Sequence, residues 1–212
     1  MRVLICGATG NIGRLTVNQA LSAGHEVTAL ARSPQKLDNQ SNLNKAQGDV
    51  RDAASIEAAM VGQEAVITVF GAPLNWSTVT SVPDLCTTGT RNIISAMKQQ
   101  EVKRLICMTG IGAGDSREHG RFVFDNLILP LLLGRIYADK NRQEREVMQS
   151  NLDWTIVRPA ELTDESETDD YRVLTDLKGQ KAKTIARTNV ADFLVKQVKS
   201  DRFLHQTPLI TK

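Results

Sequence analysis

The chain has 212 residues, of which 41% are hydrophobic and 24% are charged, and its formal net charge is +2 at pH 7. These values are typical of a globular protein with one domain and a full core. The small net charge and the lack of a long basic run exclude a strongly basic nucleic-acid binder. The longest apolar run, residues 127–133, contains a proline and is too short to cross a bilayer, so we expect no membrane partner.

The start of the chain and its cysteines bear on the cellular compartment. Met1 leads directly into a strand-like run, so we expect no signal peptide. Cys6, Cys86 and Cys107 have no metal-ligand spacing. They are typical of reduced structural thiols, so we expect a cytoplasmic protein without a metal site.

The N-terminal residues have the pattern of a phosphate-binding strand–turn–helix unit. Residues 2–6 lack polar alternation, which predicts a strand buried on both faces. Glycines follow in a G-x-x-G-x-x-G spacing, and a helical run then extends to Gly24. A helix N-terminus offers backbone N–H groups to a pyrophosphate, and glycines let it approach; the alternative is a tight turn without a ligand. The predicted dinucleotide contacts are Gly7, Thr9, Gly10, Asn11, Ile12 and Gly13.

The second predicted strand, residues 26–30, leads into Arg32 and Ser33 rather than an acidic residue. NAD-binding units place a carboxylate near this point, on the ribose hydroxyls. A guanidinium and a hydroxyl instead suit the 2′-phosphate of NADP. We therefore predict NADP, with Arg14 and Lys36 as further positive charge. The alternative is that Arg32 is a solvated loop arginine.

Three further strands are predicted over residues 43–47, 65–70 and 102–108, alternating with helices over 53–60, capped by Asp52, and 84–100. Ligands of doubly wound sheets lie outside the carboxyl ends of the strands. Two strand ends therefore predict contacts with the cofactor. These contacts are Gly71 and Ala72 at the first of these ends, and Thr109 stands at the second, where its role is implied by the resemblance described below.

Polar residues after the fifth predicted strand suggest the reacting end of the site. The charged, glycine-rich residues 111–120 are predicted to form a mobile substrate loop, with His119 as a proton donor or simply a solvated side chain. Tyr137 and Lys140 stand three positions apart, which on a helix differs by about 100° from a spacing of four but still allows a shared face. The alternative for Lys140 is an exposed i,i+4 pair with Glu144.

The remaining segments complete the expected fold. We predict a sixth strand over 154–158, short strands over 171–175 and 183–186, a helix from an N-cap at Thr188 to Val198, and a last edge strand at 208–211. The prediction is an α/β doubly wound parallel sheet, a Rossmann fold, in one domain over residues 1–212. A small C-terminal portion would face the substrate.

Two segments resemble a known superfamily. The run from Gly7 to Gly13 and the run from Trp154 to Pro159 resemble the NmrA-like branch of the atypical short-chain dehydrogenases/reductases, which includes flavin reductases similar to biliverdin reductase B. The resemblance covers nearly the whole chain in order and implies NAD(P) as cofactor. It also implies that Asp49 and Val50 border the adenine ring.

The same resemblance suggests roles at the reacting end. It implies that Thr109 faces the nicotinamide and the substrate carbonyl, where its hydroxyl would bond an oxyanion or orient the carboxamide, unless it only caps the next turn. It implies that Lys140 contacts the nicotinamide ribose, with Tyr137 as an acid candidate. The superfamily's usual Tyr–Lys spacing is four, and a histidine of the biliverdin reductase B type is replaced here by Ala160.

Together these features predict an NADPH-dependent oxidoreductase that is a monomer or a homodimer. No strong general acid is evident, which favours a small acceptor such as a flavin or a quinone. One alternative is a non-catalytic NADP-binding redox sensor. Another is a nucleotide-sugar epimerase or dehydratase, although the short C-terminal portion leaves little protein to bind such a substrate.

Overall fold

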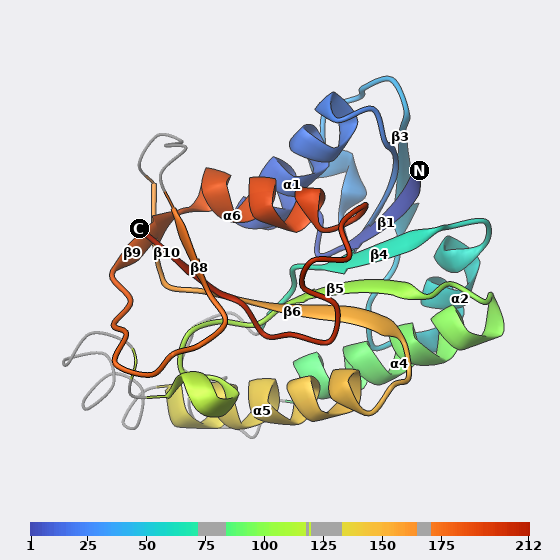
Figure 1. Cartoon of the computed structure of the whole chain (residues 1–212). Helices are drawn as coiled ribbons and strands as arrows, with labels where there is room; N and C mark the ends of the chain where they lie inside the picture. The colour runs from blue at the N-terminus through green and yellow to red at the C-terminus, as the bar shows by residue number, and fades with distance from the viewer. Residues whose placement is uncertain (72–83, 118, 120–132, 165–170) are drawn as a thin grey trace.

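A parallel sheet forms the centre of the computed structural model, which describes residues 1–71, 84–117, 119, 133–164 and 171–212 (Figure 1). Its strands are β1 (Arg2–Cys6), β2 (Glu26–Ala31), β3 (Leu43–Gln47), β4 (Ala65–Thr68), β5 (Arg104–Met108), β6 (Asp153–Pro159), β8 (Arg172–Leu174) and β10 (Leu209–Thr211). A separate pair is formed by β7 (Glu161–Thr163) and β9 (Thr184–Ala186). The helices are α1 (Asn11–Ser22), α2 (Ala53–Met60), α4 (Leu85–Gln99), α5 (Gly134–Met148) and α6 (Arg187–Lys196), with short 3₁₀ turns η1 (Pro34–Lys36) and η2 (Gly114–Ser116).

The strand order is β3-β2-β1-β4-β5-β6-β10-β8 over the described residues. Every neighbouring pair is parallel except β10 and β8, which are antiparallel. The chain runs outward from β1 in both directions, so the order reverses between β1 and β4. Cys6 is in register with both Leu30 and Thr68, which brings the ends of β1, β2 and β4 to one edge of the sheet. The predicted doubly wound Rossmann fold is confirmed.

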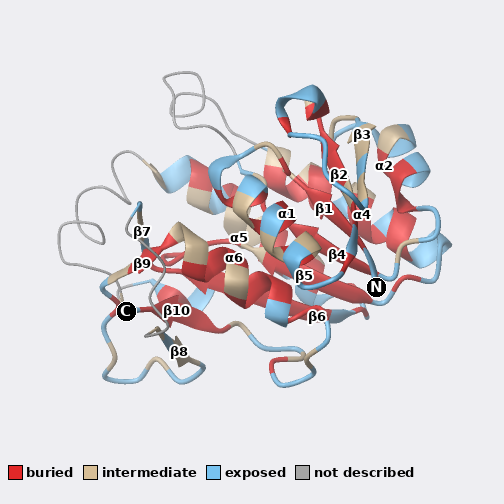
Figure 2. Cartoon of the chain, turned by 90° about the horizontal axis from the view of Figure 1, so that it is seen from above, coloured by how far each residue is buried: buried red, intermediate tan, exposed pale blue. Residues whose placement is uncertain are grey.

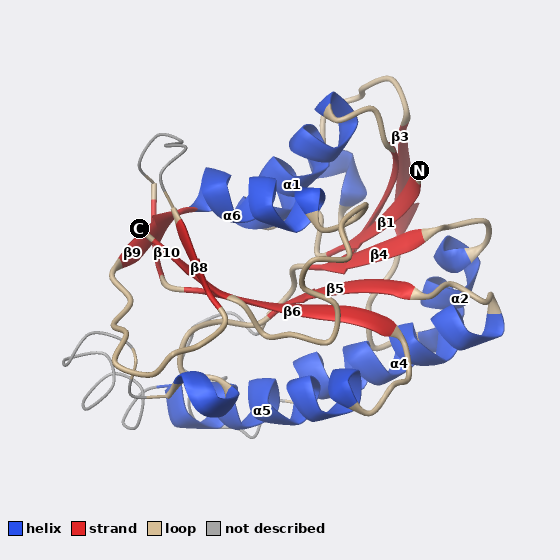
Figure 3. Cartoon of the chain, viewed as in Figure 1, coloured by secondary structure: helices blue, strands red, loops and turns tan. Residues whose placement is uncertain are grey.

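Helices cover both faces of the sheet (Figures 1 and 3). Helices α1 and α6 lie on one face, and α2, α4 and α5 lie on the other. Alternate residues of β1 serve the two cores: Val3 and Ile5 pack in one, and Leu4 and Cys6 in the other. Figure 2 shows these strands as the buried interior of the molecule. Burial on both faces explains why β1 is apolar throughout rather than alternating.

Three local predictions are wrong at the C-terminal end and at β4. Strand β10 is an interior strand, because β8 pairs with its outer side. Helix α6 begins at Arg187 with Ala186 as its N-cap, so Thr188 lies inside the helix rather than capping it. Strand β4 ends at Thr68, because Phe70 turns out of the sheet to pack beside the glycine turn and α4.

Within the ranges that the structure describes, no helix combines the length and the apolar character needed to cross a membrane. The central sheet contains strands from both ends of the chain, from Arg2 to Thr211.

Candidate functional site

The glycine turn between β1 and α1 has the geometry of an anion cradle. Gly7 has a φ of 91°, and a Cβ on it would lie 2.9 Å from the backbone nitrogen of Phe70. A Cβ on Gly13 would lie 2.2 Å from the carbonyl oxygen of Gly7, so α1 packs directly on the turn. Gly10 is the N-cap of α1, with no side-chain cap and no acidic residue in the first turn. The helix start therefore keeps its N–H groups and its partial positive charge for a ligand.

Arg14 joins this turn to the connection after β2. Its guanidinium donates to the carbonyl oxygens of Thr9 at 3.3 Å and Lys36 at 2.7 Å. The predicted phosphate-binding residue Arg32 is exposed and makes no hydrogen bond or ion pair within the described ranges. Arg32 therefore has an unbonded guanidinium just after β2, whereas the guanidinium of Arg14 is bonded to two backbone carbonyl oxygens. Ser33, next to it, is the N-cap of η1.

Asp49 and Val50, the predicted adenine neighbours, follow β3 and are held from two sides. Asp49 accepts hydrogen bonds from the side chain and the backbone N–H of Arg51, with an ion-pair distance of 3.0 Å. These bonds hold the pKa of the Asp49 carboxyl below its usual value, and the charge of Arg32 acts in the same direction. Asn92 of α4 donates to the carbonyl oxygen of Val50 at 3.0 Å.

The predicted residues of the reacting end come together where β4 and β5 end. The Nζ atom of Lys140 donates to the carbonyl oxygen of Thr109 at 3.0 Å. A Cβ on Gly71 would lie 4.0 Å from that same Nζ atom. The phenol oxygen of Tyr137 would lie 3.3 Å from a Cβ on Gly110. Segments from three parts of the chain thus meet at the edge of the sheet that carries the glycine turn.

Glu144 does not form an ion pair with Lys140. The sequence-based alternative of an exposed i,i+4 ion pair between them is therefore wrong. The Glu144 carboxylate instead makes a two-point ion pair with Arg158 at the end of β6, with distances of 2.9 and 2.7 Å. Both side chains are almost fully buried, at 2% and 1% exposed. The hydroxyl of Thr109 donates to the same carboxylate at 2.7 Å. The Thr109 proton therefore points toward Glu144 in this structure.

The loop after β5 is anchored on this buried pair. Asp115 forms an ion pair with Arg158, and the backbone N–H of Gly114 donates to the Asn141 side chain at 2.8 Å. Burial by itself lowers the pKa of Arg158, but its bonds to Glu144 and Asp115 outweigh this and raise it. The described part of the predicted mobile loop is therefore attached to both α5 and β6.

The sequence suggests His119 as a proton donor or a solvated side chain. In the structure, His119 instead forms hydrogen bonds with residues farther along the chain. Its ring Nδ1 lies 3.0 Å from the carbonyl oxygen of Gln180, and its own carbonyl accepts from the N–H of Ala182. These bonds tie the loop after β5 to the segment before β9.

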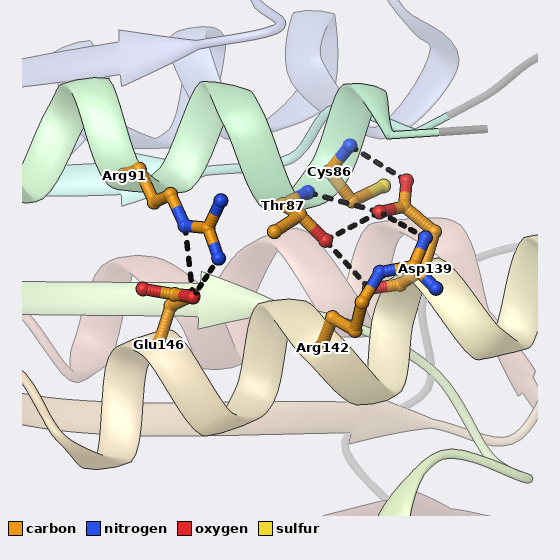
Figure 4. A network of polar contacts seen from close by, with 6 residues as sticks. All are labelled: Cys86, Thr87, Arg91, Asp139, Arg142 and Glu146. Atoms are coloured by element: carbon orange, nitrogen blue, oxygen red, sulfur yellow. Dashed lines mark hydrogen bonds and ion pairs between the residues drawn. The ribbon is translucent and has the colours of Figure 1, made fainter.

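Asp139 has a capping role that the sequence analysis missed (Figure 4). Its fully buried carboxylate, on α5, accepts hydrogen bonds from the backbone N–H groups of Cys86 at 2.8 Å and Thr87 at 3.1 Å, at the start of α4. The N-cap residue Asp84 makes no side-chain cap bond. A capping carboxylate from a neighbouring helix replaces the local cap and fixes α5, and with it Lys140, against α4.

The sequence did carry signals for these missed residues. Arg158 directly follows the apolar residues Ile156 and Val157 in a predicted interior strand, and a charge in such a place requires a buried partner. Asp139 and Glu144 lie on the inner face of an amphipathic helix, where a carboxylate likewise implies a partner.

Ala72, a predicted cofactor contact, lies outside the described ranges, and so do residues 127–132 of the longest apolar run. The three cysteines are buried, and none of them forms a disulfide within the described residues. Burial raises the pKa of Cys6 and of Cys107 to about 12, as expected of structural thiols. In the part of the chain that the structure describes, no group of three metal-ligating side chains is found.

Residues 7–201 match the model of a family described as NAD(P)H-binding. The chain belongs to this NAD(P)H-binding family. A solved Rossmann-fold NAD(P)-binding family protein from Shigella flexneri superposes with a TM-score of 0.75 and 26% identity, covering 100% of this chain and 93% of that one. The family match agrees with the resemblance to the atypical, NmrA-like branch and confirms NAD(P) as the cofactor class.

The relatives of this chain differ widely in length. The UPF0659 protein YMR090W of Saccharomyces cerevisiae is 27% identical over 208 residues, covering 93% of this chain and 87% of the relative. The chloroplastic protein TIC 62 of Arabidopsis thaliana is 28% identical over 190 residues, covering 80% of this chain. The chain spans only 28% of the length of TIC 62.

Proposed function

We propose that this NAD(P)H-binding protein is an NADPH-dependent reductase that passes hydride to a small acceptor such as a flavin or a quinone. The observation that supports it most is the meeting of Lys140, Thr109 and Gly71 at the sheet edge that carries the glycine turn. A lysine held beside two strand ends is suited to orient a ligand that extends along this edge.

The proposed cofactor contacts follow the order of the strands. Gly10 and the first turn of α1 would bind the pyrophosphate. The free guanidinium of Arg32 and the hydroxyl of Ser33 would bind a 2′-phosphate, which is the reason to propose NADPH rather than NADH. Asp49 and Val50 would border the adenine. The remaining proposed contacts are Gly7, Thr9, Asn11, Ile12, Gly13, Gly71, Ala72, Thr109 and Lys140.

The choice of acceptor rests on the donors that surround the reacting end. When bound, NADPH supplies the hydride. The Thr109 hydroxyl donates to Glu144, which removes it as a ready donor to a developing oxyanion. Tyr137 remains the acid candidate near Gly110. Flavins and quinones delocalise the added charge, so their reduction depends less on a proton delivered by the protein.

A second candidate is a non-catalytic NADP-binding redox sensor. The Tyr137–Lys140 spacing of three, instead of the superfamily's four, and the engaged Thr109 hydroxyl favour it, because both weaken the usual catalytic set. Turnover separates the two candidates, since a sensor binds the nucleotide without oxidising it.

The test is NADPH oxidation with FMN, FAD and a panel of quinones, beside calorimetric titration of NADPH. We expect saturable turnover that Lys140→Met lowers by about tenfold or more, since orientation of bound reactants contributes strongly to rate. The matched control is Lys98→Met, which removes an exposed lysine near the end of α4 and leaves turnover unchanged. Tight NADPH binding without turnover by any acceptor would move the assignment to the sensor.

A further inference from the structure

We propose that Arg51 is a positioning residue for recognition of a 2′-phosphate: it engages the Asp49 carboxylate and so leaves the guanidinium of Arg32 unpaired. Arg51 thereby helps to set the preference for NADPH over NADH without touching the phosphate itself. This inference rests on the proposed function, which places the 2′-phosphate at Arg32.

Arg32 and Asp49 leave the sheet from neighbouring strand ends. Strands β2 and β3 are parallel, with Ala31 in register with Gln47, and the N–H of Gly48 donates to the carbonyl oxygen of Ala31 at 3.0 Å. Arg32 directly follows β2, and Asp49 stands two positions after β3. An exposed guanidinium and a carboxylate at such positions attract each other, so an Arg32–Asp49 ion pair is expected if nothing else engages the carboxylate.

Arg51 engages that carboxylate instead. Its backbone N–H donates to Oδ1 of Asp49 at 2.9 Å, its Nε to the same oxygen at 3.3 Å, and its Nη2 to Oδ2 at 3.0 Å. The turn itself is fixed, because the carbonyl oxygen of Asp49 accepts from the Ser55 hydroxyl at 3.0 Å and from the N–H of Asp52 at 2.9 Å. A carboxylate bonded to the N–H two positions on is already aimed at residue 51. The Arg51 side chain therefore binds it with a smaller loss of conformational entropy than Arg32 would.

The charges follow the same arrangement. Hydrogen bonds from the side chain and then the backbone of Arg51 lower the pKa of the Asp49 carboxyl, and the charges of Arg51 and Arg32 act in the same direction against burial. Arg32 nevertheless makes no hydrogen bond or ion pair within the described ranges. The Asp49 charge is thus matched by Arg51, and the Arg32 charge remains for a ligand. A phosphate monoester carries up to about two negative charges at pH 7, so it gains more from an unpaired guanidinium than a singly charged anion does.

Loss of the Arg51 side chain reverses this arrangement. Of its bonds to Arg51, Asp49 keeps only the one from the backbone N–H, and its charge then faces Arg32. A carboxylate that pairs with Arg32 competes with the phosphate for the guanidinium, and one that stays unpaired repels the phosphate. Both effects weaken the binding of NADPH and not that of NADH, which has no 2′-phosphate.

The test is calorimetric titration of the full chain with NADPH and with NADH, and the readout is the ratio of the two dissociation constants. Contacts of residues 49 and 51 with the shared part of the nucleotides cancel in this ratio. We expect Arg51→Gln to lower the preference for NADPH about fivefold or more, because the phosphate then meets an uncompensated carboxylate. Asp49→Asn/Arg51→Gln removes that carboxylate as well, so the preference should return to within about twofold of the wild-type value. The Arg51 side chain is 56% exposed, so its substitution does not open the core.

The matched control is Asp84→Asn/Arg51→Gln, which returns the same total charge at a different carboxylate. The hydrogen bond and charge of Asp49, and then the charge of Asp84, raise the pKa of Arg51 against burial. The charges that lower the pKa of Asp49 are those of Arg51 and Arg32. This variant therefore leaves the Asp49 carboxylate beside Arg32, and the preference should stay low.

Two results with the double variants would overturn the positioning role. Equal recovery in both would mean that only net charge matters. No recovery with Asp49→Asn would mean that Arg51 contacts the phosphate directly.

Arg32→Met separates the role of Arg51 from the proposed function. If Arg32→Met lowers the preference for NADPH and Arg51→Gln does not, the NADPH assignment stands and the role of Arg51 fails. A wild-type protein without preference for NADPH would overturn both. Preference that falls in Arg51→Gln and recovers only in Asp49→Asn/Arg51→Gln supports the role of Arg51, even if no acceptor turns over and the reductase proposal fails.

Discussion

The carboxylate of Asp139 accepts a hydrogen bond of 3.1 Å from the backbone N–H of Thr87, which lies 52 positions earlier in the sequence (Figure 4). Helix α4 is therefore capped by its neighbour α5. A cap supplied by another helix does two things at once. It satisfies the buried donors at the start of α4, and it fixes the rotation of α5 about its own axis. Lys140, the next residue, is thereby aimed at Thr109.

Loss of this cap should destabilise the fold. Asp139→Ala leaves buried N–H groups without an acceptor, so we expect the free energy of unfolding to fall by about 2–4 kcal/mol. Asp84→Ala is the matched control, because the local N-cap makes no side-chain cap bond, and we expect a change below about 0.5 kcal/mol. Urea unfolding of both variants measures the difference, and equal effects would contradict the capping role.

Gly114 should be essential for a steric reason beyond its backbone conformation. Its φ is +56°, and a Cβ on it would lie 2.2 Å from Nη2 of Arg158 and 2.7 Å from Oε2 of Glu144. Gly179 has a φ of +70° but nothing within 4 Å of its Cβ position, so it controls for conformation alone. We expect Gly179→Ala to cost about 1 kcal/mol and Gly114→Ala at least 2 kcal/mol more.

The measurement for the glycine pair is urea unfolding combined with amide hydrogen exchange. Gly114→Ala should also speed exchange in residues 111–117, because the loop must leave the Glu144–Arg158 pair. Unchanged exchange there, with a stability loss equal to that of Gly179→Ala, would show that the loop is not seated on the ion pair.

His25 should make stability depend on pH. It is 3% exposed, and its Nδ1 has no partner within the described residues. Burial first, then the positive N-terminus and Lys199, lower its pKa from the ordinary 6.5, while Glu64 opposes them. The folded state therefore binds the proton less readily than the unfolded chain. Stability is present in full above pH 6.5 and falls as the pH drops below that value.

The check for His25 is the free energy of unfolding of wild type and His25→Gln at pH 7.5 and 5. The variant removes the titrating group, so its loss of stability between the two pH values should be smaller than that of the wild type. Parallel losses in the two proteins would assign the acid sensitivity to other groups.

Replacement of Arg32 should change cofactor preference. Arg32→Asp puts a negative charge where the 2′-phosphate is proposed to bind, so we expect affinity for NADPH to fall at least about tenfold more than affinity for NADH. Arg145→Asp, which makes the same charge change on an exposed residue near the end of α5, is the control. Calorimetric titration with NADPH and with NADH measures both affinities. Equal losses of affinity for the two nucleotides would contradict the proposed NADP preference.

Much of the fold follows from local patterns in the sequence. The bounds of β1 and β3, the helix over Ala53–Met60 and its Asp52 cap were predicted as the structure has them. These features depend on neighbours within a few residues: an apolar run, a glycine spacing, or a carboxylate just before a helix. The glycine turn and the order of elements likewise predict a dinucleotide-binding Rossmann fold, whereas NAD(P) as the cofactor class follows from the family resemblance.

The partners of the buried charges were decided by tertiary structure alone. From the sequence, Glu144 could face Lys140 one turn away or any cation elsewhere, and only the packing of α5 on β5 and β6 selects Arg158 and Thr109. The interior place of β10 likewise depends on β8, since a strand pattern does not say what lies on its outer side. Local sequence determines which elements form, whereas contacts between distant segments determine which polar groups meet inside them.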